Sequence, residues 1–232
     1  MTSPAKEKAA TSALKQRTKK VVEILFTTYP EAQTALGHSS PLELLIATIL
    51  SAQCTDQRVN IVTKDLFQRY RTVQDYANAD IKEVERLVHS TGFYHAKAKN
   101  IIGCCTALLK NYGGKVPDSL EELISLPGVG RKTANVVLGS SFGKAEGIVV
   151  DTHVRRISQR LHFTTETNPE RIEQDLTGIV PQKYWISFSH LLIFHGRAIC
   201  SARKPACPDC PIRRYCPSAG KVFKNTKALN KS

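Results

Sequence analysis

The sequence has little that would place the protein in a membrane or outside the cell. It contains no run of about 18 apolar residues, which is the length that a helix needs to cross a bilayer. No apolar segment follows the polar start Met1-Thr-Ser-Pro-Ala-Lys6, so a signal peptide is not expected. We therefore expect a cytoplasmic protein without a membrane partner.

Acidic residues are also scarce. The chain has 20 Asp and Glu against 33 Lys and Arg, which gives a net charge of +13 and a pI of about 9.5. Such an excess favours a polyanionic partner, and nucleic acid is the commonest one for a protein of this size. We expect residues 1–17 to form a disordered basic arm, either a solvated tail or a weak nucleic-acid contact, and residues 225–232 a flexible tail.

Strand-like patterns are missing as well. No segment alternates apolar and polar residues over the length of a strand, whereas helical spacing recurs throughout, for example over residues 18–29, 41–50 and 95–111. The expected fold is therefore all-α. With 232 residues the chain can form one large domain or two small ones.

The seven cysteines do not suggest disulfides, because their number is odd and no export signal is expected. We expect three of them, in helical patterns, to be buried apolar residues: Cys54, Cys104 and Cys105. The other four form a C-x6-C-x2-C-x5-C pattern that can close around one metal centre: Cys200, Cys207, Cys210 and Cys216. By spacing alone, zinc and a cubane iron–sulfur cluster are both possible, and the single C-x2-C pair leans towards iron–sulfur.

Residues 118–138 predict two helices joined by a tight turn. Ser119 and Glu122 suggest a capping box at the first helix, Pro127 ends that helix, and a second helix should begin near Gly130. Gly128 and Gly130 give the turn its backbone freedom. The turn and the second helix's N-terminus present unpaired N–H groups that suit a phosphate oxygen. Taken alone, this hairpin indicates only a grip on a nucleic-acid backbone, with Arg131 and Lys132 beside it.

A second short pattern is Val150-Asp151-Thr152-His153, at the start of a predicted helix. By default, an Asp in this place is an N-cap. The positive potential of a helix N-terminus stabilises the ionised carboxylate. Asp151 can therefore be both a cap and a functional carboxylate.

Lys132 in the hairpin, Asp151 in V-D-T-H and the four-cysteine pattern together resemble the endonuclease III family of bifunctional DNA glycosylases/lyases. The resemblance runs from about Thr18 to Val222. It implies two lobes: a six-helix barrel domain at residues 34–144, and a domain of residues 18–33 and 145–224 that carries a 4Fe–4S cluster on all four cysteines. DNA would lie between the lobes.

The resemblance also implies a reaction. The Lys132 amine would attack C1′ of the sugar, expel an oxidised or saturated pyrimidine and form a Schiff base, after which β-elimination cuts the strand 3′ to the site. Asp151 would assist deprotonation or stabilise the cationic sugar. The expected partner is double-stranded DNA with damaged pyrimidines or abasic sites, and we expect a monomer that acts at the bacterial nucleoid.

Several further DNA contacts follow from the same resemblance. Gln53 would enter the duplex after the damaged nucleotide swings out, and Phe93 stands where the family commonly has a leucine wedge. Without the resemblance, Gln53 reads as a surface residue and Phe93 as a core residue. Lys97 and Lys99 read as phosphate contacts or a solvated face. The remaining contacts implied are in the hairpin and the cysteine loop: Gly128, Gly130, Arg131, Arg203 and Lys204.

Three other interpretations stay open. A non-catalytic hairpin DNA-binding protein would explain the charge and the glycines, but it gives no reason for pairing Lys132 with Asp151. A zinc-finger-type regulator would explain the cysteines. The related adenine-mismatch glycosylases lack the hairpin lysine and carry an added C-terminal domain. This chain has Lys132 and stops soon after Cys216, which counts against that branch.

Overall fold

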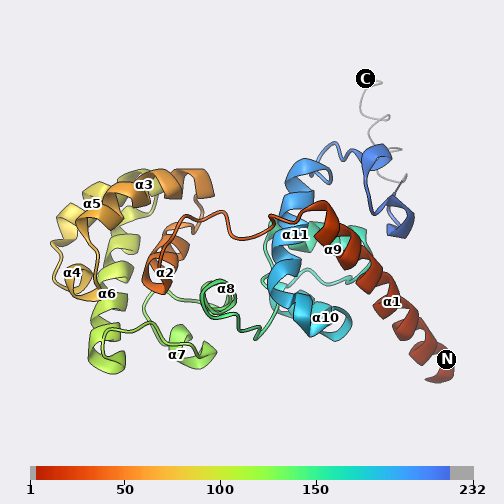
Figure 1. The fold of residues 1–232 in the computed structure, drawn as a ribbon, viewed down its shortest axis with the longest axis horizontal. Helices are drawn as coiled ribbons and strands as arrows, with labels where there is room; N and C mark the ends of the chain where they lie inside the picture. Colours follow the sequence, from red (N-terminus) through yellow and green to blue (C-terminus); the bar gives the residue numbers. More distant parts are fainter. Residues whose placement is uncertain (1–3, 220–232) are drawn as a thin grey trace. The chain divides into compact units, whose positions relative to one another are not determined.

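The computed structural model describes residues 4–219, and every regular element among them is helical, which confirms the all-α prediction (Figure 1). Within these residues, no helix is long and apolar enough to cross a membrane. The α-helices are α1 Pro4–Thr28, α2 Pro41–Leu50, α3 Asp56–Arg69, α4 Val73–Ala77, α5 Ile81–Val88, α6 Tyr94–Tyr112, α7 Leu120–Ile124, α8 Arg131–Phe142, α9 Thr152–Arg160, α10 Pro169–Ile179 and α11 Trp185–Ala198. The short 3-10 turns are η1 His89–Thr91, η2 Gln182–Tyr184, η3 Cys207–Asp209 and η4 Arg213–Tyr215.

The chain divides into two compact units. The inserted unit is Thr34–Glu146, and the terminal unit contains the described residues before 34 and after 146. The ranges expected from the sequence, 34–144 for one lobe and 18–33 with 145–224 for the other, nearly coincide with this division. Residues 220–224 of the second range and the expected tail at 225–232 lie outside the described residues.

The expected disordered arm at residues 1–17 is wrong for residues 4–17, because α1 begins at Pro4. Ala, Lys, Glu, Gln and Leu dominate this stretch and all have high helix propensity. The helix is also tied down at its middle: Arg17 Nη1 donates to the carbonyls of Leu161, at 2.7 Å, and Tyr215, at 3.0 Å. Its basic residues therefore belong to a helix, and residues 1–3 lie outside the described chain.

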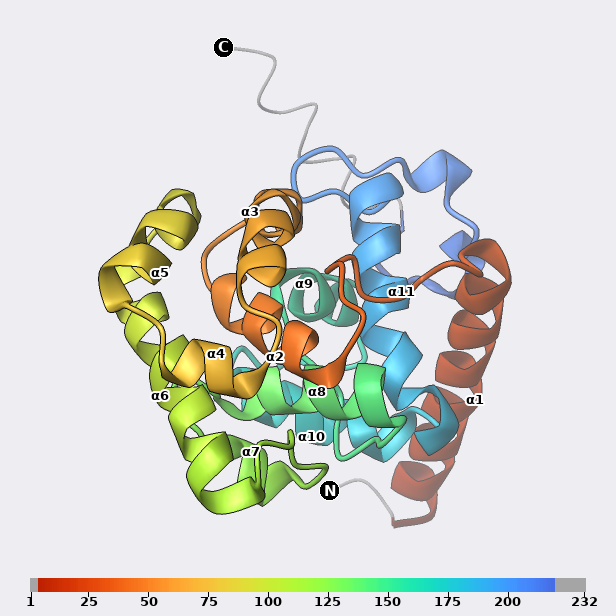
Figure 2. The same ribbon diagram turned by 60° about the vertical axis from the view of Figure 1, so that its left-hand side comes forward.

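The inserted unit is built around α2. This helix is apolar nearly all round and is buried from Leu44 to Leu50, and it packs against α3, α6 and α8 (Figure 1). Its start follows from Ser40 and Pro41: Ser40 Oγ accepts a hydrogen bond from Glu43 N, and proline fits the first helical position. Figure 2 shows α5 beside α6, and both α4 and α5 contact α6.

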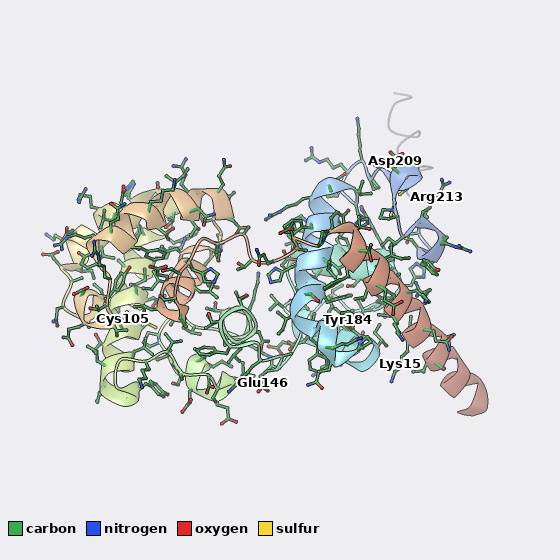
Figure 3. The ribbon with its side chains drawn as sticks, viewed as in Figure 1. Lys15, Cys105, Glu146, Tyr184, Asp209 and Arg213 are labelled. Atoms are coloured by element: carbon green, nitrogen blue, oxygen red, sulfur yellow. The ribbon has the colours of Figure 1, made fainter. Side chains whose placement is uncertain are left out.

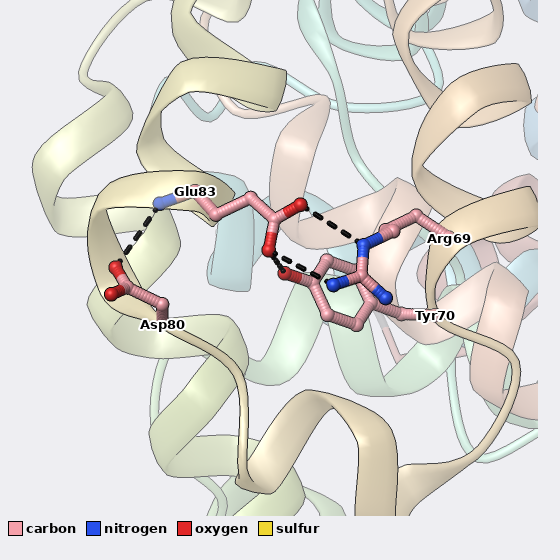
Figure 4. A network of polar contacts seen from close by, with 4 residues as sticks. All are labelled: Arg69, Tyr70, Asp80 and Glu83. Atoms are coloured by element: carbon pink, nitrogen blue, oxygen red, sulfur yellow. Dashed lines mark hydrogen bonds and ion pairs between the residues drawn. The ribbon is translucent and has the colours of Figure 1, made fainter.

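A polar network joins the end of α3 to the start of α5 in this unit (Figure 4). Arg69 donates through Nε and Nη2 to the two carboxylate oxygens of Glu83, at 2.9 and 3.2 Å, and Tyr70 donates its hydroxyl to the same carboxylate at 2.9 Å. These hydrogen bonds lower the pKa of Glu83, that from Arg69 most. Asp80 caps α5 by accepting from Lys82 N and Glu83 N. The network fixes the end of α3 against the start of α5.

The terminal unit packs α1, α9, α10 and α11 around a second apolar core. Val21, Val22 and Leu25 of α1 meet Leu191 and Leu192 of α11 in this core. After α11 the chain becomes irregular, and residues 199–219, which we call the cysteine segment, contain only η3 and η4. Figure 3 labels two exposed residues of this segment, Asp209 and Arg213.

The helices α9 and α11 approach each other at a glycine. A Cβ placed on Gly196 would lie 2.5 Å from His153 Nδ1 and 3.0 Å from Ile157 Cδ1. Real Cβ atoms do not come so close to a packed neighbour. Gly196 therefore sets the position of α9, and with it the position of Asp151 at the start of that helix.

Candidate functional site

The predicted hairpin is present as α7, a turn over residues 125–130, and α8. Leu126 and Val129 are buried and anchor the turn from below. Gly128 has φ of 76°, and a Cβ there would lie 2.7 Å from Asn100 Cβ, so this position requires glycine. The predicted capping box at Ser119 is wrong, because its side chain makes no capping hydrogen bond.

The N-terminus of α8 carries no side-chain cap. Gly130 is the N-cap residue and has no side chain to supply one. The N-cap residue therefore supplies no side-chain acceptor at the start of α8, and such a helix N-terminus can accommodate a phosphate oxygen. Both side chains are exposed, while Ala134, Val137 and Leu138 bury the opposite face of the helix. Lys132 thus combines an exposed amine with an immobile backbone.

Asp151 is the N-cap of α9, as the sequence predicts. Its Oδ1 accepts a hydrogen bond from Val154 N at 2.8 Å, and the residue is half-buried. Next to it, burial lowers the pKa of His153, whose Nδ1 lies 3.1 Å from Arg156 Nη2. Lys132 belongs to the inserted unit and Asp151 to the terminal unit, so their pairing stays a prediction about the DNA-bound protein.

Gln53 and Phe93 lie on two turns of the inserted unit, and both are exposed. Phe93 exposes 66% of its surface, so its alternative reading as a core residue is wrong. Both residues have left-handed backbones, with φ of 52° and 50°. This conformation costs roughly 1–2 kcal/mol for a residue with a Cβ, so surrounding contacts must hold each turn.

One of those contacts comes from a lysine that was expected to lie at the surface. Lys97 is only 4% exposed, and its Nζ donates to Leu50 O and to Thr91 O, both at 2.8 Å. Burial lowers its pKa. The interpretation of Lys97 as a phosphate contact or a solvated residue is therefore wrong, whereas Lys99 is exposed. Helical spacing could have predicted this burial, because Lys97 is in register with the buried residues Ile101, Cys104 and Leu108.

The four cysteines of the predicted metal site are brought together. All four are free and half-buried, and they line one cavity with apolar neighbours such as Ile157, Leu161 and Ile212. Burial raises the pKa of Cys210 to about 11 and also raises that of Cys216. Of the remaining cysteines, Cys104 and Cys105 are buried in the inserted unit as expected, while Cys54 is half-buried.

Polar donors surround this cavity. Arg160 Nη1 lies 3.2 Å from Cys200 Sγ and also donates to Ser201 O at 2.7 Å, while Nη2 donates to Ala202 O at 2.8 Å. His195 Nε2 lies 3.6 Å from Cys210 Sγ, and its Nδ1 lies 3.1 Å from Tyr29 Oη. Burial lowers the pKa of His195 to about 4, so this imidazole is neutral at pH 7.

The residues that line the cavity fit an iron–sulfur cluster, because the four cysteines face one space and each thiolate of a cubane binds one iron. The apolar lining and the N–H group of Arg160 beside Cys200 also suit a buried cluster that carries negative charge.

Arg203 and Lys204 lie between the first two cysteines, and both side chains are exposed. The loop therefore presents positive charge, as expected, and a contact of this loop with DNA stays a prediction.

Comparison with known proteins identifies the family. The family model for the HhH-GPD superfamily base excision DNA repair protein matches residues 46–182. Endonuclease III of Synechocystis sp. is 53% identical over 205 residues, which cover 88% of this chain and 94% of that protein. The chain belongs to the endonuclease III family. Endonuclease III of Escherichia coli K12 is 43% identical over 193 residues, which cover 83% and 91% of the two chains.

Solved structures of endonuclease III agree. A non-covalent endonuclease III–DNA complex has a TM-score of 0.85 and 44% identity and covers 90% of this chain and 98% of its own. A trapped endonuclease III–DNA covalent intermediate has a TM-score of 0.84 at the same identity and coverage. The family predicted from the sequence is confirmed. So is the enzyme class: this endonuclease III family member is a base excision repair DNA glycosylase/lyase.

Proposed function

We propose that this enzyme removes oxidised or saturated pyrimidines from double-stranded DNA and then cuts the strand, with the amine of Lys132 as the nucleophile. The observation that carries the proposal is the placement of Lys132. It is exposed in the first turn of α8, directly after an uncapped turn that suits phosphate, and the opposite face of the helix is buried. A phosphate held at residues 128–132 would bring the neighbouring sugar within reach of this amine.

The proposed chemistry balances as a substitution followed by an elimination. Lys132 Nζ forms a bond to C1′ while the bond from C1′ to the base breaks, and the base leaves with a proton. The C1′–O4′ bond of the resulting aminal then breaks and O4′ takes up a proton, which opens the sugar ring and gives the Schiff base. The Schiff base loses a proton from C2′, and the C3′–O bond breaks, so that the strand is cut 3′ to the site. The ammonium form of Lys132 cannot attack, so the reaction requires the neutral amine.

Asp151 would serve this reaction through its charge. Val154 N donates to Oδ1 of this carboxylate, and the second carboxylate oxygen is available for the reaction. We propose that, on DNA, this carboxylate accepts the proton of Lys132 or stabilises positive charge on the sugar as the base departs.

Nucleotide flipping would involve the two exposed turns. A base in a duplex is out of reach while it is stacked, so the damaged nucleotide must leave the helix. Gln53 would hydrogen-bond the base left without a partner, and Phe93 would separate the base steps beside it. The aromatic ring retains the apolar chemistry of a wedge.

The cluster proposed for the terminal unit is a 4Fe–4S centre held by Cys200, Cys207, Cys210 and Cys216. When bound, it would supply a cross-link that fixes the cysteine segment. That cross-link would hold Arg203 and Lys204 on an ordered loop, where they can meet a DNA phosphate. A brown colour and visible absorbance of the purified protein would support the cluster, whereas a colourless zinc-containing protein would contradict it.

Borohydride trapping tests the nucleophile. Wild type should form a covalent adduct with a duplex that contains an oxidised pyrimidine, and Lys132→Ala should lose the adduct while still binding the duplex. Lys64→Ala is the matched control, because Lys64 is an exposed lysine on α3 of the same unit. Undiminished trapping by Lys132→Ala would refute the assigned role.

Asp151→Asn tests the carboxylate separately from the cap. Asparagine caps helices about as well as aspartate, so α9 should stay intact. We expect base removal to slow by about 10²-fold or more, in keeping with the loss of a general base or a charge stabiliser. Full activity in this variant would exclude a role for the charge. Elution of the active protein at the size of one chain would support a monomer.

A further inference from the structure

The buried ammonium of Lys97 joins two separate turns of the inserted unit. Helix α2 ends at Leu50 and leads into the turn that carries Gln53, while η1 ends at Thr91 and leads into the turn that carries Phe93. Lys97 Nζ donates to the last carbonyl of each element, at 2.8 Å in both cases. One side chain from α6 therefore holds the starting points of both turns.

The charge of Lys97 is not balanced by a carboxylate. Within the described part of the chain, no Asp or Glu forms an ion pair with it, and the side chain is almost fully buried. Burying an ammonium without an anion is unfavourable, and an apolar side chain in this helical register would fill the same space. The buried ammonium is therefore unfavourable for stability, and we look for its role in the two carbonyls that it binds.

Those carbonyls suit a cation. Leu50 O lies at the C-terminus of α2, where the helix dipole places partial negative charge. The helix ladder does not use it for Cys54, because Cys54 N donates instead to Ser51 O at 3.1 Å. Lys97 takes the place of that helical hydrogen bond, and the chain is free to turn at Gln53.

Each turn has strained backbone and short-range hydrogen bonds of its own, such as Cys54 N to Ser51 O at 3.1 Å in the first turn and Lys97 N to Phe93 O at 3.1 Å in the second. Gln53 and Phe93 both have left-handed backbones, and Gly92 between Thr91 and Phe93 has φ of 70°. The second turn has a weak backbone hydrogen bond, from Gly92 N to His89 O at 3.3 Å, and Thr91 Oγ1 donates to Val88 O at 2.8 Å. The positions of the exposed residues Gln53 and Phe93 therefore depend on the buried ends of α2 and η1.

We propose that Lys97 is a positioning residue for nucleotide flipping, because it holds the turns of Gln53 and Phe93 at a fixed spacing so that both side chains enter the duplex together. This inference rests on the roles proposed above for Gln53 and Phe93. Without the ammonium, the two turns move independently, and insertion of one side chain no longer orders the other. The amine of Lys132 is unaffected, so chemistry on a sugar that is already accessible is retained.

The test compares substrates that do and do not need insertion. Lys97→Met removes the charge at similar volume, Lys97→Arg retains a cation with several donors, and Lys110→Met changes an exposed lysine on the same helix. Lys97→Met should slow single-turnover base removal from a duplex by at least about tenfold, as expected for misplaced groups. Borohydride trapping on a single-stranded abasic site should stay within about twofold of wild type, because no stacked base has to be displaced.

A fluorescent base reports insertion directly. In wild type, 2-aminopurine opposite the lesion should change its emission when Gln53 enters, and this change should be lost in Lys97→Met and restored in Lys97→Arg. Lys110→Met should behave as wild type. A core-packing role alone would reduce the folded fraction and affect both substrates equally, and that result would overturn the proposal.

A coupling measurement completes the design. In a Gln53→Ala, Phe93→Ala background, adding Lys97→Met should change duplex cleavage by less than about twofold, because the residues act as one unit. Full additivity would overturn the proposal. If Lys97→Met does not fold, the same measurements use Lys97→Gln, which retains an N–H donor. Wild type that forms no Lys132-dependent adduct would instead refute the proposed function itself.

Discussion

The inserted unit and the cysteine segment are held together in opposite ways. The inserted unit buries an apolar helix, α2, among α3, α6 and α8, and most of its buried side chains are apolar. The cysteine segment has two 3-10 turns and places Ile212 in the apolar core of its unit. Its backbone is fixed by two guanidinium groups, because Arg17 and Arg160 donate to carbonyls of Tyr215, Ser201 and Ala202.

The difference shows what each region needs from its side chains. Apolar burial stabilises a structure at roughly 25 cal/mol per Å² and requires regular elements with a continuous face. A segment without such elements must satisfy its carbonyls individually, and the proposed cluster would add to its stability. The same residue type illustrates both cases: Cys104 fills a core, while Cys210 lines the proposed cluster site.

The largest expected effect comes from removing one proposed ligand. Cys210→Ser should eliminate the brown colour and expose the cysteine segment to protease, because the proposed cluster would cross-link this segment. The helices of the inserted unit should be retained, as measured by hydrogen exchange. Cys54→Ser, a half-buried cysteine of the inserted unit, is the control and should stay coloured.

A core substitution in the inserted unit should reduce the stability of the protein and leave the proposed cluster in place. Leu45→Ala removes a fully buried side chain from α2 and should reduce the free energy of unfolding by about 3 kcal/mol, measured by urea titration. The visible absorbance of the folded protein should be unchanged. Ile61→Ala, at an exposed position on α3, should have a much smaller effect. Loss of the cluster in Leu45→Ala before unfolding would show that the two regions are not independent.

The guanidinium contacts should have an intermediate effect. Arg160→Met leaves several carbonyls without a donor and should cost about 2 kcal/mol in stability, since the group is half-buried and its hydrogen bonds are charge-assisted. We also expect faster loss of visible absorbance in the presence of a chelator. Arg155→Met removes an exposed arginine from the same helix and should leave both quantities unchanged.

The smallest effect is a pH dependence of the inserted unit. Burial raises the pKa of Cys104 from 9.0 to about 12, so above pH 9 the thiol ionises more readily in the unfolded chain than in the folded one. The contribution of the neutral thiol to the free energy of unfolding is therefore complete below pH 9 and is lost as pH rises towards 12. At pH 10 the expected loss is about 1 kcal/mol. Cys104→Ala should reduce the slope of unfolding free energy against pH between pH 8 and 10. An unchanged slope would contradict this assignment.

The helices and several local features of the chain were accessible from the sequence, because each depends on local patterns. The N-cap at Asp151, the hairpin glycines and the cysteine spacing all involve residues close together in the chain. The length of α1 was missed because charge was weighed above helix propensity. Ser119 was misread because a capping box in the sequence does not ensure the hydrogen bond.

Lys97 and the two left-handed turns could not be read in this way. The carbonyls that bind Lys97 come from residues 47 and 6 positions away, so the burial of the ammonium depends on how α2, η1 and α6 meet. The left-handed backbones of Gln53 and Phe93 are similarly set by long-range contacts, since neither residue type favours that conformation.

The position of α1 has a consequence for synthesis. Its apolar residues Val21, Val22 and Leu25 pack on α10 and α11, which follow only after the whole inserted unit has been made. At 5–20 residues per second, the ribosome needs roughly 10–30 s to pass from Leu25 to Leu192. The inserted unit can complete its own core during that interval. The first helix made is therefore among the last to be buried, and its apolar face is open to chaperones throughout.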